Sequence, residues 1–416
     1  MNTSIPIVRL IQYGLIAFPL AFAGLPIYLH APDFYAVNLG LRIEAIGAVL
    51  LILRLFDAVQ DPVIGRLSDR FHAQRRGIIL FGVLLLVGGF WMIFHPLTDY
   101  PLAWLALSVL VCTTGFSVVT INVQALGGLW QVPNHEVARV MGAREALGLF
   151  GLLVASIVPP VLLMFYDYET TYHGLALALL PLTALGIFAL MRWMNFAHLT
   201  PPQSEFELST GRILSGSQTR LFLLSYLLGA IASSIPATLI LFYVRDYLQA
   251  ESYLGLFLVI YFVSGAAAMP LWNECAKRFP TLMSWWLSMV LACATFVWAL
   301  TLQPGDVVGY ALVCMISGVS VGANLALPSA IAAHIIAEKQ HQSAASRYYA
   351  VMALLSKAAL ALATGLALPL LGWAGYQPGE PSSGWLMPTA YALMPCLVQM
   401  LAIGVLWRLI LQTKHR

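Results

Sequence analysis

The sequence predicts an all-α integral membrane protein, and three observations lead to this fold class. Hydrophobic side chains make up 60% of the 416 residues, charged side chains only 9%, and the mean hydropathy is +0.83. Soluble domains carry about 25% charged residues. Apolar segments recur along the chain, each long enough for the roughly 20 residues with which a helix crosses a bilayer. The first segment lacks the features of a cleaved signal peptide, so we expect it to be the first span.

Polar and Pro/Gly-rich breaks divide the chain into twelve candidate helices. The helices are expected at 8–32, 42–70, 76–96, 101–130, 136–165, 171–197, 220–245, 252–278, 281–302, 306–337, 344–372 and 386–411. The longest connection is rich in Ser, Thr and Pro, which predicts a linker at 198–219. We therefore expect two six-helix bundles, at 1–197 and 220–416.

Lys and Arg collect at one face of these predicted bundles. Only Arg42 and Arg245 fall at the other face, where the acids Asp33, Asp99 and Asp306 also lie. An excess of cations marks the cytoplasmic side of a membrane protein. The pattern predicts a multi-pass protein of the cell inner (cytoplasmic) membrane with both termini in the cytoplasm.

The second predicted span contains two carboxylates, Asp57 and Asp61, in the stretch RLFDAVQDPVIGRLSDR. Residues four apart share one helical face. Two ionised carboxylates in a low-dielectric bundle repel each other and lose hydration unless a cation neutralises them or one takes up a proton. The pair predicts a cation or proton site; the alternative is that both acids only make polar contacts with Arg54.

The same stretch resembles the second helix of the glycoside-pentoside-hexuronide:cation symporters, a family of the major facilitator superfamily. The pattern R-x-x-D-A-x-x-D-P-x-x-G is carried by Arg54, Asp57, Ala58, Asp61, Pro62 and Gly65. Weaker similarity occurs elsewhere in the chain, in the same order as in the family. It is found at Tyr13–Gly14, ALGG (125–128), Arg144, LALPSAIAAH (325–334) and Lys357. The resemblance implies the major facilitator fold with 12 transmembrane helices.

The resemblance also implies a coupling-ion site at Asp57 and Asp61, completed by Gln60 and Ser117. Oxygen ligands suit Na⁺, and a protonated carboxylate gives the H⁺ version, so the coupling ion stays open between these two. No other cofactor is expected. Ser117 could instead bond to its own helix backbone.

Lys357 matches a family lysine near the cation site, and we expect it to form a charge network with Arg54 and the two acids. An ammonium group inside an apolar span is costly without an acid as partner. The alternative is that Lys357 reaches an interface through its long side chain.

The solute site is less well specified by the resemblance. Arg144 matches a sugar-pocket arginine, or it pairs permanently with acids near Glu145 or in the second helix. The family's two sugar-binding acids are replaced by Ala21 and Thr120. Because hydroxylated ligands need their polar groups satisfied on leaving water, the loss of these two acids disfavours a galactoside as the solute. The other polar candidates are Tyr28, Asn122, Gln124, Asn324 and His334, although a lone helix histidine can also be a packed, hydrogen-bonded residue.

GRLSDR and the arginines after it resemble the superfamily's loop between helices 2 and 3. Asp69 stands there at a helix end among cations, and we predict that it latches to the neighbouring bundle and stabilises an outward-open state. The alternative is a solvated turn. The predicted cytoplasmic latch consists of Gly65, Asp69, Arg70, Arg75 and Arg76.

These features predict a secondary active transporter that couples symport of a small solute, such as a sugar or glycoside-like compound, to Na⁺ or H⁺ by alternating access. The alternatives are cation-coupled transport of a lysolipid or other amphiphile, and proton-driven efflux of apolar compounds. A membrane enzyme is disfavoured, because no Ser/His/Asp order, metal-spaced cluster or Gly-rich phosphate loop is found. The expected partners are the solute and the bilayer, with a monomeric chain, and the net charge of +3 gives no indication of nucleic acid.

Overall fold

The computed structural model describes residues 5–97, 99–200, 216–373, 376 and 384–414. Eleven helices in this part of the chain are long and apolar enough to cross a membrane. Helix α3 (Ile43–Arg70) is not among them, because Arg54, Asp57 and Asp61 interrupt its apolar stretch. With α3 included, the described helices correspond to the twelve predicted spans, and the predicted all-α membrane fold is confirmed.

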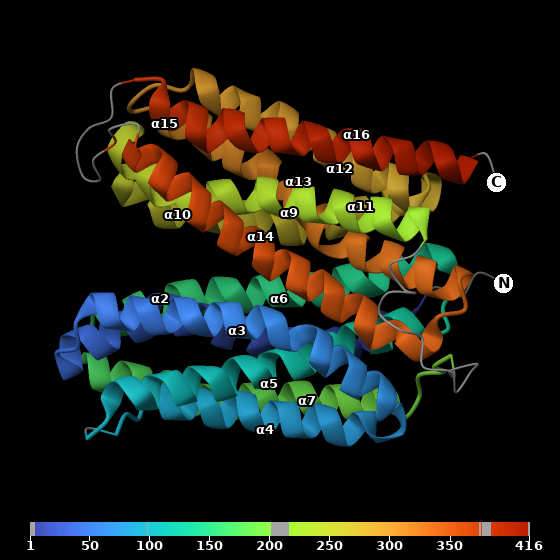
Figure 1. Ribbon diagram of the computed structural model, residues 1–416, viewed down its shortest axis with the longest axis horizontal. Helices are drawn as coiled ribbons and strands as arrows, with labels where there is room; N and C mark the ends of the chain where they lie inside the picture. The colour runs from blue at the N-terminus through green and yellow to red at the C-terminus, as the bar shows by residue number, and fades with distance from the viewer. Residues whose placement is uncertain (1–4, 98, 201–215, 374–375, 377–383, 415–416) are drawn as a thin grey trace. The chain divides into compact units, whose positions relative to one another are not determined.

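The chain forms two compact units, each shown as a group of helices in Figure 1. The first unit is Met1–Glu207 together with Ala332–Ala353, and the second is Leu208–Ile331 together with Leu354–Arg416. The segment 332–353 therefore packs with the first unit. The predicted division into bundles at 1–197 and 220–416 stays a prediction. The central part of the predicted linker lies outside the described residues, as does the side chain of Tyr28.

The first unit begins with two helices where one span was expected at 8–32. Its helices are α1 (Ile7–Gly14), α2 (Ala17–Leu39), α3, α4 (Arg75–Ile93), α5 (Pro101–Leu129), α6 (Asn134–Leu162) and α7 (Tyr168–Met194), with the 3₁₀ turn η1 (His72–Gln74) between α3 and α4. Helix α2 ends at Gly40, whose φ of 64° is left-handed. Glycine adopts this conformation without strain, which explains why α2 stops at this position. Asp167 caps α7 by accepting a hydrogen bond from the Thr170 backbone N–H (3.2 Å).

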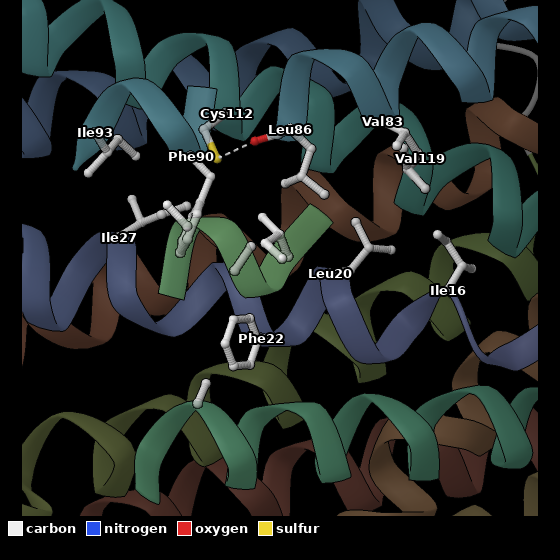
Figure 2. Packing of buried hydrophobic residues seen from close by; sticks show 14 of the residues in the cluster. Ile16, Leu20, Phe22, Ile27, Val83, Leu86, Phe90, Ile93, Cys112 and Val119 are labelled. Atoms are coloured by element: carbon white, nitrogen blue, oxygen red, sulfur yellow. Dashed lines mark hydrogen bonds between the residues drawn. The ribbon is translucent and has the colours of Figure 1, made fainter. Parts of the chain in front are cut away.

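The core of the first unit lies between α2, α4 and α5. Figure 2 shows Phe22 and Ile27 of α2 with Leu86 and Phe90 of α4 in this cluster. Cys112 of α5 donates its thiol hydrogen to the Leu86 carbonyl (3.4 Å). This packing fixes α5 against α4 and so determines which face of α5 is left for α3.

The second unit contains helices that are interrupted more often. They are α9 (Ser217–Phe242), η2 (Tyr243–Tyr247), η3 (Glu251–Tyr253), α10 (Leu254–Ala267), α11 (Met269–Arg278), α12 (Thr281–Trp298), η4 (Ala299–Thr301), most of α13 (Val307–Glu338) and α14 (Ala345–Trp373), α15 (Leu386–Pro388), η6 (Thr389–Leu393) and α16 (Met394–Lys414). The break before α11 precedes Pro270, which lacks a backbone N–H. The segments η2 and η6 are π-helical, and their residues Tyr243 and Tyr391 stack with ring centroids 4.0 Å apart.

Two neighbouring glycines of α4 test the close packing of α4 on α5. A Cβ on Gly89 would lie 2.4 Å from the Cys112 backbone nitrogen, whereas a Cβ on Gly88 would meet nothing within 4 Å. We expect Gly89→Ala to lower the melting temperature of the purified protein, because overpacking costs about 1–3 kcal/mol. Gly88→Ala is the control and should melt at or above the wild-type temperature. Equal melting temperatures for the two variants would contradict the close contact.

Candidate functional site

Asp57 lies on the face of α3 that packs against α5. Its Oδ1 atom accepts hydrogen bonds from Gln60 Nε2 (2.8 Å) and from Ser117 Oγ (3.3 Å). Asp57 and Ser117 are both buried. The structure therefore brings together three of the four residues predicted for the cation site, through contacts of Asp57 with its own helix and with α5.

Thr114 is a further member of this group that sequence reasoning missed. Its hydroxyl donates to Gln60 Oε1 (3.0 Å) and also lies 2.7 Å from the Leu110 carbonyl oxygen. Thr114 precedes Ser117 by three residues, so both hydroxyls lie on one helical face. That spacing is the sequence signal that could have identified it, once Ser117 was assigned to the site.

Asp61 lies one turn beyond Asp57 and is completely buried, with a relative exposure of 0%. Arg54 lies one turn before Asp57 and is half-buried. Lys357 is half-buried in the part of α14 that belongs to the second unit. The predicted charge network among these groups stays a prediction. No cluster of three or more His, Cys, Asp or Glu side chains able to hold a metal occurs among the residues described.

Asp69, at the end of α3, caps the first turn of α14 within the first unit. Its Oδ1 accepts a hydrogen bond from the Ser346 backbone N–H (2.8 Å), and its Oδ2 accepts from the backbone N–H (3.1 Å) and Nε (2.9 Å) of Arg347. A carboxylate is favoured here because the free N–H groups give a helix N-terminus a partial positive charge. Asp69 is thus an N-terminal cap supplied by another helix, and we call this the α3–α14 contact.

Two other residues of the predicted latch belong to the α3–α14 contact. Arg75 is buried, donates to Ser346 Oγ (3.0 Å) and lies 3.8 Å from Asp69 Oδ1. A Cβ on Gly65 would lie only 2.5 Å from the Ala350 Cβ, so glycine permits the close approach of α14. These α14 residues had no signal in the sequence, because their role depends on a neighbour almost 280 positions earlier.

The remaining two latch residues are placed elsewhere. Arg70 is exposed and lies over the Phe71 ring at 5.9 Å. Arg76 donates to the Met194 carbonyl (3.2 Å), so it caps the end of α7. The contacts described for Arg70 and Arg76 are therefore with other residues of the first unit.

The solute candidates on α5 separate into two faces. Thr120 and Gln124 are half-buried and four residues apart, so they continue the face that carries Ser117. The Thr120 hydroxyl is buried and makes no hydrogen bond within the described structure. Asn122 points away from that face and donates to Ser68 Oγ (2.8 Å) and to the Val118 carbonyl (2.9 Å). Asn122 therefore ties α5 to α3.

The other solute candidates already have partners within their own units. Arg144 is buried and pairs with the adjacent Glu145, while its Nε makes no hydrogen bond in the described part of the chain. Asn324 accepts a hydrogen bond from Trp285 Nε1 (2.9 Å). His334 Nε2 lies 3.2 Å from the Asn134 carbonyl oxygen, at the start of α6. Asn324 and His334 are ten residues apart on α13, which is about 15 Å along a helix.

The comparisons with known proteins agree with this fold. The family model described as MFS/sugar transport protein matches residues 10–413, so the chain belongs to this family. It is therefore a membrane transporter of the major facilitator superfamily and not an enzyme, which confirms the resemblance seen in the sequence.

Solved structures with the same fold have low sequence identity. A bacterial homologue of the iron transporter ferroportin, in an outward-facing state, has a TM-score of 0.74 at 15% identity, covering 97% of this chain and 99% of the other. The E. coli fucose:proton symporter has a TM-score of 0.69 at 13% identity, covering 97% and 98%. These identities support the fold alone. No curated protein matches the sequence.

The α3–α14 contact predicts the effect of Asp69→Asn. The amide keeps the shape of the side chain but leaves the buried Arg75 and Arg347 without their anion. We expect a loss of about 3 kcal/mol, as for other broken buried pairs, seen as a lower melting temperature in detergent. Arg70→Gln, at the next position but exposed, is the control and should melt like the wild type. A stable Asp69→Asn variant would contradict the assigned contact.

His341, between α13 and α14, predicts a pH dependence of stability. Its Nδ1 lies 2.8 Å from the Tyr348 hydroxyl, and its pKa is lowered below 6.5 by burial and by the nearby cations Lys339 and Arg347. The folded state therefore binds the proton less readily than the unfolded chain. Stability present above pH 6.5 is lost as the pH falls through 6.5 toward the lowered pKa.

Melting curves in detergent across this pH range check the sign of the His341 effect. In the His341→Gln variant, the melting temperature should decline less on acidification than in the wild type, because glutamine does not titrate. His72→Gln, at an exposed position, should keep the wild-type decline. If the melting temperature of His341→Gln falls with pH as steeply as that of the wild type, other groups cause the acid sensitivity.

Proposed function

We propose that this transporter is a cation-coupled symporter of a small solute, such as a sugar or glycoside-like compound, and that it works by alternating access. The observation that carries the proposal is the buried Asp57, with polar groups from α3 and α5 directed at its Oδ1. Asp61 is buried one turn further along the same helix. Two acids at this depth are costly in hydrocarbon unless they exchange a cation during the transport cycle.

Coupling follows from the electrostatics of this pair. A cation that neutralises the acids removes their mutual repulsion and lets α3 pack closely against its neighbours. The solute then binds best to the neutralised protein, and the differential affinity links the solute's movement to that of the cation. The proposed coupling ion is Na⁺ or H⁺.

The α3–α14 contact has the properties of a gate in this cycle. Asp69 caps α14 with hydrogen bonds from backbone and side chain, so the contact stabilises one state and must break for the other. The distribution of Lys and Arg supports the proposal that the gate and both termini face the cytoplasm, in the inner membrane.

The α5 face that carries Ser117 supports a polar solute. Thr120 and Gln124 continue this face beyond the cation-site residues, and the Thr120 hydroxyl is available for a hydrogen bond. Buried polar groups of this kind favour a ligand that can pair with them over an apolar compound. Membership of the MFS/sugar transport protein family supports the same solute class.

Uptake by reconstituted vesicles tests the proposal. A panel of radiolabelled sugars and glycosides is screened under an inward Na⁺ gradient and, separately, under an inward H⁺ gradient. We expect one of these to drive accumulation of a solute, and Asp61→Asn to abolish accumulation while insertion is unchanged. Glu274→Gln is the control, because Glu274 pairs only with Lys277 and Arg278 on the surface of its own helix in the described structure. Undiminished gradient-driven uptake by Asp61→Asn would refute the mechanism.

A further inference from the structure

We propose that Thr114 is the residue that excludes sodium from the site at Asp57, by holding the Gln60 side chain as a hydrogen-bond donor. The inference rests on the proposed symport function and deepens it, because it concerns the choice of ion at the same site. It assigns Thr114 as a specificity-determining residue that acts through Gln60.

The orientation of the Gln60 amide follows from its two neighbours. At one end it meets Asp57 Oδ1 at 2.8 Å, and a carboxylate oxygen can only accept, so the amide nitrogen must face it. At the other end it meets the Thr114 hydroxyl at 3.0 Å, and this group donates to Oε1. Rotating the amide would place two acceptors against each other at Asp57. The two contacts therefore fix one orientation.

This orientation works against sodium in two ways. Sodium is a hard cation that binds oxygen ligands, and the amide oxygen of Gln60 is turned toward Thr114 and away from Asp57. The amide hydrogens, which carry positive partial charge, face the carboxylate instead. In addition, the lone pairs of Asp57 Oδ1 already accept hydrogen bonds from Gln60 and Ser117. A sodium ion would have to displace these donors, whereas a free amide could supply its oxygen as a ligand.

Thr113 gives a closely matched comparison with Thr114. The Thr113 hydroxyl donates to the Leu110 carbonyl oxygen at 3.4 Å. The Thr114 hydroxyl has one hydrogen, which lies between that carbonyl oxygen (2.7 Å) and Gln60 Oε1 (3.0 Å). Of these two hydroxyls, only that of Thr114 makes a hydrogen bond to Gln60 among the contacts of the described residues. Replacing either residue by valine conserves the side-chain shape, so a difference between the two variants isolates the contact to the amide. If Thr114 excludes sodium through Gln60, only Thr114→Val should alter ion choice.

The test is equilibrium binding of radioactive Na⁺ to purified protein, with choline chloride holding the ionic strength constant. We expect no saturable binding to the wild type or to Thr113→Val. Thr114→Val should bind Na⁺ saturably, because the loss of about one hydrogen bond to the Gln60 amide corresponds to a change of about tenfold in affinity. Adding Asp57→Asn to Thr114→Val should abolish that gain.

A second variant keeps the test decisive if Thr114→Val does not fold. Gln60→Asn has a side chain too short to hold both contacts, so it should also gain sodium binding. Saturable sodium binding to the wild type that Asp57→Asn removes would overturn the inference, as would the absence of any gain in both variants. Either result leaves symport itself intact, because the proposed function is judged separately by gradient-driven uptake with Asp61→Asn.

Discussion

The cost of placing carboxylates inside a membrane-spanning helix is the constraint on which the first unit of this transporter depends. Helix α3 carries Asp57 and Asp61 in its apolar stretch and Asp69 at its end, and all three are buried. A buried charge is tolerated only where donors or cations satisfy it. The interior and the C-terminal end of α3 meet this requirement differently, and the difference separates the proposed ion site from the proposed gate.

At Asp69 the requirement is met by backbone N–H groups together with arginine side chains. Two N–H groups at the start of α14 and the side chain of Arg347 converge on one carboxylate. Such a contact is strong but can be lost as a whole, because all donors belong to one helix turn. At Asp57 the donors are the side chains of Gln60 and Ser117, which come from α3 and α5. Side chains can reorient individually, which suits a site that must bind and release an ion.

The packing of α4 on α5 holds α5 in position for its contacts with α3. Glycines at the interface let the two backbones approach closely, and the apolar cluster of Figure 2 fills the space toward α2. Helix α5 is thereby held with its polar face, including Thr114 and Ser117, directed to α3. The second unit is built with more interruptions, among them two π-helical segments that meet at a tyrosine stack. Wide helical turns of this kind often occur at functional positions.

The sequence by itself determined the class of protein and the approximate spans. It also singled out Asp57 and Asp69, whose roles in transport stay predictions. Hydropathy, charge and the spacing of acids are properties of neighbouring residues, and they can be read along one chain. Tertiary structure alone decided that Thr114 contacts Gln60, that Ser346 and Arg347 receive Asp69, and that Asn122 binds α3 instead of sharing the face of Thr120. It also placed segment 332–353 with the first unit. These outcomes depend on which helices pack together and at what rotation, and local sequence patterns do not specify long-range packing.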